Sequence, residues 1–240
     1  MTVNSTIATL LGTVFIAAML VGCGHSPQPD PTAVPDPTPT PIDVAALLTR
    51  SGAATSALNT FRFQLEHNRE GATPLTESLR VTEADGRVVN PDAVSVDFAG
   101  TLGSFAVRSS LITLGDDSYM TNPLTGAWEQ VAREVSPLGF FDPQRGIGSM
   151  MTEVQSPVLI EKSDSEFVIE GALPVEALEP LLGGLMEGNT VDVRLNIDSD
   201  SLYLTRAILD GRLTASEPDG VVRTITLSEF NEQVTIEPPG

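Results

Sequence analysis

The sequence predicts an α+β fold in which a few helices accompany an antiparallel sheet. Apolar and polar residues alternate in most segments between residues 61 and 230, as expected for strands with one covered and one wet face. Three other stretches, residues 43–58, 143–154 and 174–186, repeat apolar residues at helical spacing. Because short turns join successive strands, we expect an antiparallel sheet whose apolar face is covered by these helices.

The first 41 residues differ in composition from the rest. An uncharged, mostly apolar run from Ile7 to Val21 ends at Leu20-Val21-Gly22-Cys23, and Cys23 is the only cysteine of the chain. This pattern is typical of a lipoprotein signal peptide, residues 1–22, that is cut before an acylated Cys23. The alternative is an ordinary secretory signal with an incidental cysteine. Signal peptides usually begin with a positively charged region, but no Lys or Arg precedes this run. This departure bears on the efficiency of export and on the position of the start codon.

Residues 23–41 are predicted to be an acylated cysteine followed by a proline-rich linker, because seven prolines lie between residues 24 and 41. Residues 42–240 then form the folded part, which is long enough for one domain with a sizeable core or at most two small ones. Its first helix, residues 43–58, has Asp43 placed to cap it and Leu47 and Leu48 on its apolar side.

The first strands follow from the two-residue period. Phe61, Phe63 and Leu65 share one face of a strand, and a hairpin from Leu79 is predicted to turn at Asp85-Gly86 and resume at Val88. Further strands are predicted at 94–98, 105–111, around 119, and at 128 after a turn at 122–126.

The second half continues this pattern. A loop at 140–143 is predicted to enter the helix 143–154, and Pro174 is expected in the first turn of the helix 174–186. Strands are predicted at 158–160, 167–173, 191–197, 202–209 and 222–230, with a turn at 198–201 between two of them.

Charge excludes one class of partner. The chain has 32 acidic residues against 13 Lys and Arg, a net charge of −19. Such a surface repels nucleic acid and anionic headgroups, so we expect no nucleic-acid partner, and a cargo, if present, that is neutral or zwitterionic.

Residues that could support catalysis or metal binding are few. The sequence has no nucleophile elbow, zinc-protease, phosphate-loop or dinucleotide motif, so we expect no cofactor, no metal and no enzymatic activity. His67 is predicted on or just past the polar side of its strand, as a solvated side chain. Asp198-x-Asp200 lacks the later ligands of a calcium loop and is interpreted as a turn, and Asp116-Asp117 also falls at a predicted turn.

A set of short motifs, taken in order, resembles the LppX/LprG-type (LppX_LprAFG) lipoproteins, which are similar in fold to the LolA/LolB lipoprotein carriers. The motifs are Gly86-x-Val88, Pro91-Asp92, Tyr119, Pro123-x-Thr125-Gly126-x-Trp128, Phe141-Asp142-Pro143, Gly146, Ile197-Asp198, Ser228-Glu229-Phe230 and Val234-x-Ile236. The resemblance implies a curved antiparallel half-barrel with helices across its concave face and an apolar cavity between them. It also implies that the cavity holds acyl chains of a lipid or glycolipid, which the protein carries across the cell envelope.

Candidate cavity residues are apolar side chains on the predicted covered face: Phe105, Val107, Leu111, Val193, Leu195, Ile147, Met150, Met151, Leu182, Leu185 and Met186. Residues 181–186 contain two glycines within an apolar helical run, which fits either a core helix with a glycine cap or a flexible lid over the cavity.

The favoured prediction is therefore a lipid carrier anchored to the cell membrane through Cys23, on the extracytoplasmic side. The alternative is a non-catalytic structural or interaction lipoprotein whose interior is filled by its own side chains. The sequence does not identify the lipid or a transporter partner.

Overall fold

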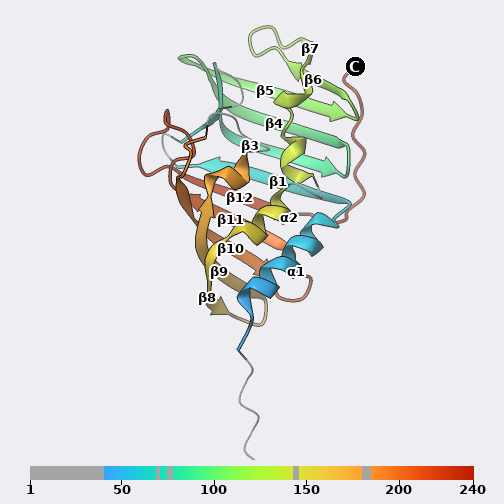
Figure 1. Cartoon of the computed structure of the whole chain (residues 1–240). Helices are drawn as coiled ribbons and strands as arrows, with labels where there is room; N and C mark the ends of the chain where they lie inside the picture. Colours follow the sequence, from blue (N-terminus) through green and yellow to red (C-terminus); the bar gives the residue numbers. More distant parts are fainter. Residues whose placement is uncertain (1–40, 69–70, 75–77, 143–145, 180–184) are drawn as a thin grey trace, which may run out of the picture. The chain divides into compact units, whose positions relative to one another are not determined.

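Twelve strands form one antiparallel sheet in the part of the chain that the structure describes (Figure 1). The structure is a computed structural model that describes residues 41–68, 71–74, 78–142, 146–179 and 185–240. The strand order is β7-β6-β5-β4-β3-β1-β12-β11-β10-β9-β8, and the short β2 pairs with β3. The predicted antiparallel α+β fold is confirmed in this respect.

The strands have the following bounds: β1 Thr60–His67, β2 Thr73–Pro74, β3 Leu79–Val89, β4 Ala93–Leu102, β5 Phe105–Leu114, β6 Asp117–Thr121, β7 Trp128–Val131, β8 Gln155–Lys162, β9 Glu166–Pro174, β10 Thr190–Asp198, β11 Leu204–Asp210 and β12 Val222–Ser228. Only one neighbouring pair on the main path is distant in sequence, because β1 lies beside β12 with Phe63 opposite Leu227. The first and last strands therefore meet in the middle of the sheet and join its two halves.

The two-residue period separates the faces of the sheet as the sequence predicts. In β10 the side chains of Val191, Val193, Leu195 and Ile197 are buried, whereas the intervening residues are half-buried or exposed. On the polar face, Arg62 forms ion pairs with Asp85 and Glu229. The guanidinium of Arg62 lowers the pKa of Asp85 below its ordinary value.

The predicted hairpin turn at Asp85-Gly86 is wrong. Strand β3 runs without interruption from Leu79 to Val89, and Gly86 pairs with Phe63 of β1 and Val96 of β4. A Cβ atom at Gly86 would lie 2.5 Å from the Phe63 ring, so the missing side chain makes room for that ring. Glycine in this strand therefore marks a close approach between neighbours rather than a turn.

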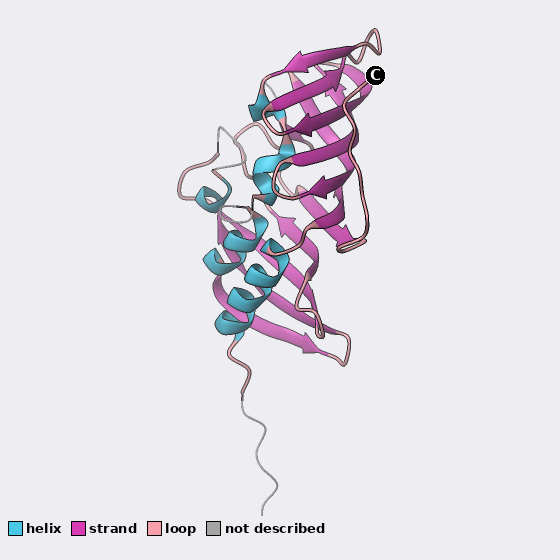
Figure 2. Cartoon of the chain, turned by 90° about the vertical axis from the view of Figure 1, so that its right-hand side faces the viewer, coloured by secondary structure: helices cyan, strands magenta, loops and turns pink. Residues whose placement is uncertain are grey.

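Helix α1 (Val44–Ser56) confirms the first predicted helix, and Asp43 caps it by accepting a hydrogen bond from the Ala46 N–H at 3.0 Å. Its buried side includes Leu47 and Leu48. Figure 2 shows the helices on one side of the sheet. The described helices include none that is long and apolar enough to cross a membrane.

The other two predicted helices are shorter than expected. Residues 143–154 contain α2 (Ile147–Met150) and the 3-10 turn η3 (Met151–Glu153), while residues 143–145 lie outside the described residues. Residues 133–141 form two further 3-10 turns, η1 (Arg133–Val135) and η2 (Pro137–Phe141).

The helix predicted at 174–186 is replaced in its described parts by the 3-10 turn η4 (Val175–Leu178) and a β-bridge from Leu185 to Thr214. Pro174 ends strand β9 rather than lying within a helical turn. Residues 180–184, with their two glycines, lie outside the described residues. Of the apolar residues at helical spacing, Val175 and Leu178 are buried, and the single turn of η4 is enough to place both in the interior.

Candidate binding pocket

A pocket of about 780 Å³ lies between the sheet and the segment that contains η1 and η2. Its sheet wall comes from the middle strands and its opposite wall from residues 133–142. The apolar lining residues are Phe63, Leu65, Val81, Ala84, Val96, Phe98, Leu111, Val135, Leu138, Phe141, Leu178, Leu209, Leu213 and Ile225. A volume of this size is within the usual range of small-molecule sites, roughly 300–1,000 Å³.

Aromatic contacts and hydroxyl groups hold the η2 wall against the sheet. The Phe141 ring packs on Phe61 and Phe63, with ring centroids 5.2 and 4.6 Å apart. The Thr113 hydroxyl of β5 donates to Ser136 Oγ at 2.8 Å, and Ser136 Oγ accepts from the Leu138 N–H at 3.2 Å. These contacts fix the wall at both ends of η2 and leave the pocket between it and the sheet.

The space beneath α2 is filled instead. A second pocket there measures only about 40 Å³ and is lined by Ile147, Met150, Met151, Val154, Leu173, Leu178, Val193, Leu195, Leu204, Ala207, Leu209 and Ile225. It shares Leu178, Leu209 and Ile225 with the larger pocket. The interior is thus packed with side chains on the α2 side and hollow on the η2 side.

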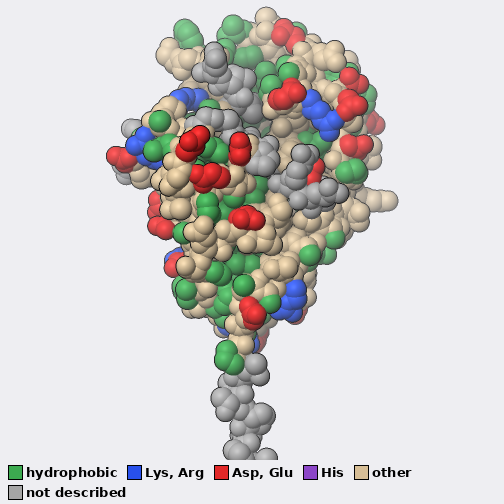
Figure 3. Space-filling view, viewed as in Figure 1, with side chains coloured by type: hydrophobic (Ala, Val, Ile, Leu, Met, Phe, Trp, Pro, Cys, Tyr) green, Lys and Arg blue, Asp and Glu red, His purple; other side chains and the backbone are tan. Residues whose placement is uncertain are grey.

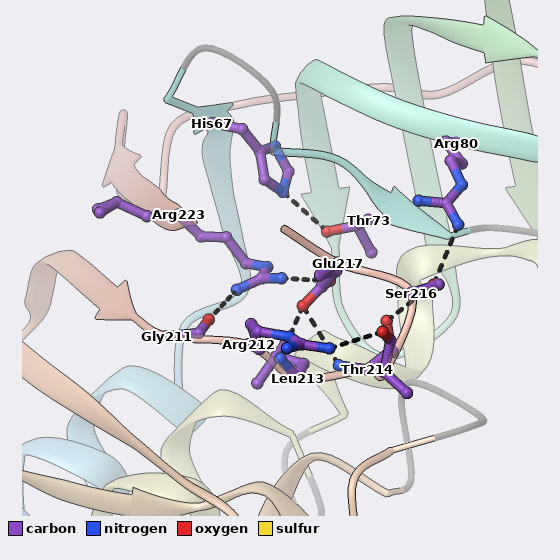
Figure 4. Close-up of polar contacts among 12 residues, drawn as sticks. His67, Thr73, Arg80, Gly211, Arg212, Leu213, Thr214, Ser216, Glu217 and Arg223 are labelled. Atoms are coloured by element: carbon purple, nitrogen blue, oxygen red, sulfur yellow. Dashed lines mark hydrogen bonds and ion pairs between the residues drawn. The ribbon is translucent and has the colours of Figure 1, made fainter. Parts of the chain in front are cut away.

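A buried ion pair stands at the wall of the larger pocket (Figure 4). Arg223 is 3% exposed and pairs with Glu217, which is 4% exposed. Arg223 Nη1 also donates to the Gly211 carbonyl at 2.9 Å, and Glu217 Oε2 accepts from the Leu213 N–H at 2.7 Å. The pair fastens the loop between β11 and β12, and each charge balances the other in a site with little water.

His67 lies next to this pair, because it is opposite Arg223 in the β1–β12 register. Its Nδ1 donates to the Thr82 carbonyl at 2.9 Å, so Nε2 accepts from the Thr73 hydroxyl at 3.0 Å. Burial lowers the pKa of His67 below its ordinary value of 6.5. The predicted solvated histidine on the polar face is wrong, because residue 67 has the same parity as Phe61, Phe63 and Leu65.

The acidic residues at two predicted turns bind neighbouring polar groups. Asp198 Oδ1 accepts from the Ser201 N–H at 2.7 Å and the Ser201 hydroxyl at 2.6 Å, which confirms the predicted turn and lowers the Asp198 pKa. Asp116 forms an ion pair with Arg133. The described part of the chain contains no group of three His, Cys, Asp or Glu residues that could hold a metal ion.

The candidate residues from the sequence are divided between the two pockets. Leu111 lines the larger pocket. The residues that line the smaller pocket are Ile147, Met150, Met151, Val193 and Leu195. Val107 is buried but belongs to neither lining. Leu185 and Met186 are half-buried, and Met186 N–H donates to the Leu213 carbonyl at 2.8 Å. Cys23 and Leu182 lie outside the described residues.

Phe105 differs from the prediction, because its side chain is 72% exposed. It lies on the same side of the strand as Val107 and Leu111 by alternation, but it is the first residue of β5. The sequence-based candidates also omitted most of the lining of the larger pocket. Alternation does place Phe63 and Phe98 on the covered face, but no pattern indicates that residues 133–142 leave space above them.

Acidic side chains predominate on one face of the molecule. Figure 3 shows more Asp and Glu than Lys and Arg side chains on the face in view. This agrees with the net charge of −19 for the whole chain.

Comparison with known proteins gives one family match and several similar structures. The family model described as LppX_LprAFG lipoprotein matches residues 43–236. The fold is similar to LprF from Mycobacterium bovis, with a TM-score of 0.63 and 18% sequence identity over 81% of this chain and 96% of that chain. Lipoprotein LppX from Mycobacterium tuberculosis gives a TM-score of 0.55 and 19% identity over 82% of this chain and 100% of that chain.

A LolA superfamily protein from Nitrosomonas europaea has 13% identity over 82% of this chain and 96% of that chain, and its TM-score of 0.28 is too low to carry an argument. No curated protein matches this sequence. The likeness to LprF and LppX establishes the fold of the chain.

Proposed function

Because the chain belongs to the LppX_LprAFG lipoprotein family, we propose that it is a membrane-anchored lipoprotein that binds acyl chains of a lipid or glycolipid and carries the lipid across the cell envelope. The observation that carries this proposal is the pocket of about 780 Å³ lined mostly by aliphatic and aromatic side chains. In this proposal the sheet is a half-barrel, and α1, α2 and η2 cover its concave face around the acyl chains.

Burial of hydrocarbon supplies the affinity in this proposal. Each buried methylene gains about 0.8 kcal/mol, so a sixteen-carbon chain gains roughly 12 kcal/mol before other terms are counted. Lost motion of the lipid and ordering of side chains offset several kcal/mol of that gain. The remainder is enough to hold a molecule that does not cross water alone, and no bond needs to be made or broken.

The N-terminal residues supply the anchor in this proposal. Residues 1–22 are the signal peptide, Cys23 carries the acyl groups, and residues 24–41 form a spacer of up to roughly 55 Å between the bilayer and the domain at 42–240. The domain then works on the extracytoplasmic side of the cell membrane. We expect Cys23→Ala to leave the protein unprocessed or unanchored, as measured by intact mass and detergent phase partitioning; an unmodified Cys23 in membrane-extracted wild type would contradict the anchor.

A structural lipoprotein with a self-filled interior is the second candidate. The observation that favours it is the packed region beneath α2, where only about 40 Å³ is free. On this account the larger pocket would be empty or hydrated in the cell, and the protein would act through its surface alone.

Extraction of noncovalent lipid separates the two candidates. The full-length protein is purified in a mild detergent and extracted with organic solvent, which leaves the lipid on Cys23 attached to the protein. The carrier proposal predicts about one acyl-chain lipid per protein by mass spectrometry, above the level recovered from an unrelated lipoprotein purified in the same way. Equal traces from both proteins would favour the structural candidate.

A further inference from the structure

The charges around the larger pocket point to the headgroup that it accepts, an inference that rests on the proposed function. The ionisable residues among the described lining are Arg133, Glu134, Asp142, Glu179 and Arg223. A site for a phosphate or carboxylate headgroup usually offers a cation that is free to pair with it, most often an arginine. The partners of the two arginines therefore decide whether an anionic headgroup is favoured.

Arg223 has its charge balanced inside the protein. Its guanidinium pairs with Glu217, and Glu217 Oε2 is held by the backbone N–H groups of Leu213 and Thr214 at 2.7 and 3.2 Å (Figure 4). An anion beside this neutral pair would lose its hydration and gain little Coulomb attraction in return. Arg223 is therefore a poor receptor for an anionic headgroup.

Arg133 is balanced as well, because it forms an ion pair with the exposed Asp116. Beside it on η1, the exposed side chain of Glu134 lines the pocket, and Glu179 lines it from the end of η4. Neither Glu134 nor Glu179 has a cationic partner among the described residues. The exposed part of the lining therefore carries excess negative charge, with the same sign as the net charge of −19.

We infer that the pocket selects its ligand by headgroup charge and takes lipids with an uncharged headgroup in preference to anionic lipids with the same acyl chains. The apolar lining binds the chains of both kinds alike. Glu134 and Glu179 disfavour the anionic kind, and the guanidinium groups of Arg223 and Arg133 are already paired with Glu217 and Asp116.

The test is a competition between two lipids that differ only at the headgroup. Full-length protein in detergent is mixed at low ionic strength with phosphatidylcholine vesicles that contain equal amounts of dipalmitoylglycerol and dipalmitoylphosphatidylglycerol. The protein is then separated from the vesicles, and its noncovalent lipid is quantified. Both lipids are in the same vesicle, so repulsion between the protein and the vesicle surface acts on them equally.

The matched variants change net charge by the same amount at different places. Glu134→Lys with Glu179→Lys reverses the two lining charges. Glu161→Lys with Asp192→Lys reverses two exposed charges on strands β8 and β10, outside the lining of either pocket. All four side chains are exposed, so both double variants are expected to fold.

Wild type and the control variant should bind dipalmitoylglycerol over dipalmitoylphosphatidylglycerol by about threefold or more, and the Glu134/Glu179 variant or high salt should bring that ratio towards one. Equal capture of both lipids by wild type, or the same ratio in both double variants, would overturn the inference and leave the proposed function standing. Capture of neither lipid by wild type would overturn the proposed function, and the inference with it.

Discussion

At the scale of single residues, we expect the polar cluster of His67, Arg223 and Glu217 beside the pocket to make the stability of the protein depend on pH. Burial keeps His67 neutral by lowering its pKa, and the positive charge of Arg223, which stands opposite, acts in the same direction. The hydrogen bond to the Thr82 carbonyl acts the other way but does not outweigh them. The carboxylate of Glu217 is the one described acidic side chain in this cluster, and it is already engaged by Arg223 and by two backbone N–H groups. Protonation of His67 therefore opposes folding.

We expect the free energy of unfolding to fall as the pH is lowered from 7 to 5. The pKa of His67 is lower in the folded state than its unfolded value of 6.5, so its contribution is complete above 6.5 and is lost as the pH falls below it. The loss is at most about 1.4 kcal/mol per pH unit. Urea unfolding of wild type and His67→Gln at pH 7, 6 and 5 measures it.

The glutamine keeps a hydrogen-bond donor and acceptor but does not titrate. His67→Gln should therefore lose less stability than wild type over this range. Equal losses in the two proteins would assign the pH dependence to groups other than His67. Asp85 and Asp198 would not explain it, because their lowered pKa values affect stability only at more acidic pH.

At the scale of elements, the contact between α1 and α2 depends on two glycines. A Cβ atom on Gly52 would overlap the carbonyl oxygen of Gly148, and a Cβ atom on Gly148 would lie 2.5 Å from the Gly52 carbonyl oxygen. The two helices therefore approach each other through bare backbone, and backbone cannot move aside as a flexible side chain can.

Gly52→Ala should destabilise the protein by about 1–3 kcal/mol, although alanine alone favours a helix by about 1 kcal/mol. Thermal or urea unfolding measures the change. Thr49→Ala, at an exposed position of the same helix, serves as the control and should change stability by less than about 0.5 kcal/mol. A stabilised Gly52→Ala protein would mean that α1 and α2 are not in this close contact.

The hollow and filled halves of the interior predict opposite responses to added volume. Leu111 of β5 lines the larger pocket, so the indole of Leu111→Trp has space to enter, and bound lipid should fall with little change in the melting temperature of the lipid-free protein. Leu195 of β10 lies in the packed half, so Leu195→Trp should cost about 1–3 kcal/mol whether or not lipid is present.

Lipid extraction and melting curves of the two variants give the comparison. If Leu111→Trp retained lipid at the wild-type level, or lost as much stability as Leu195→Trp, Leu111 would not border an open acyl site.

Secondary structure was predictable where a local pattern decides it. The alternation in β4 and β10 and the Asp43 cap depend on neighbouring residues only, and the sequence predicts them correctly. The prediction at Gly86 is wrong because a turn and a close approach both favour glycine, and only the ring of Phe63, in another strand, distinguishes them. The apolar residues at 174–186 fit a helix by spacing, yet their described parts form the single turn of η4 and a β-bridge from Leu185 to Thr214, a residue distant in sequence.

The pocket itself was predictable only in part. Alternation identifies the apolar face of the sheet, and Leu111 lies on it. The position of Phe141 decides which side chains line the open space. Its ring packs on Phe61 and Phe63 and so positions η2 above β1. That is a contact between residues about 80 positions apart, which no local pattern encodes.

At the scale of the whole domain, one sheet supports two interiors of different character. Strands β9–β11 lie under α1 and α2 with little free volume, and the strands from β1 to β5 border the larger pocket. The packed half supplies stability without a disulfide, since the chain has a single cysteine.

The central claim is that acyl chains bind between η2 and the middle strands. The most direct measurement is photo-crosslinking of the full-length protein with a palmitic acid that carries a diazirine near its methyl end, followed by peptide mapping. The account predicts labels on peptides that contain Phe98, Leu111, Leu138 or Ile225, and loss of those labels when unlabelled palmitic acid is in excess. Labels confined to exposed apolar residues such as Val158 and Ile160, or labels that excess palmitic acid does not reduce, would contradict it.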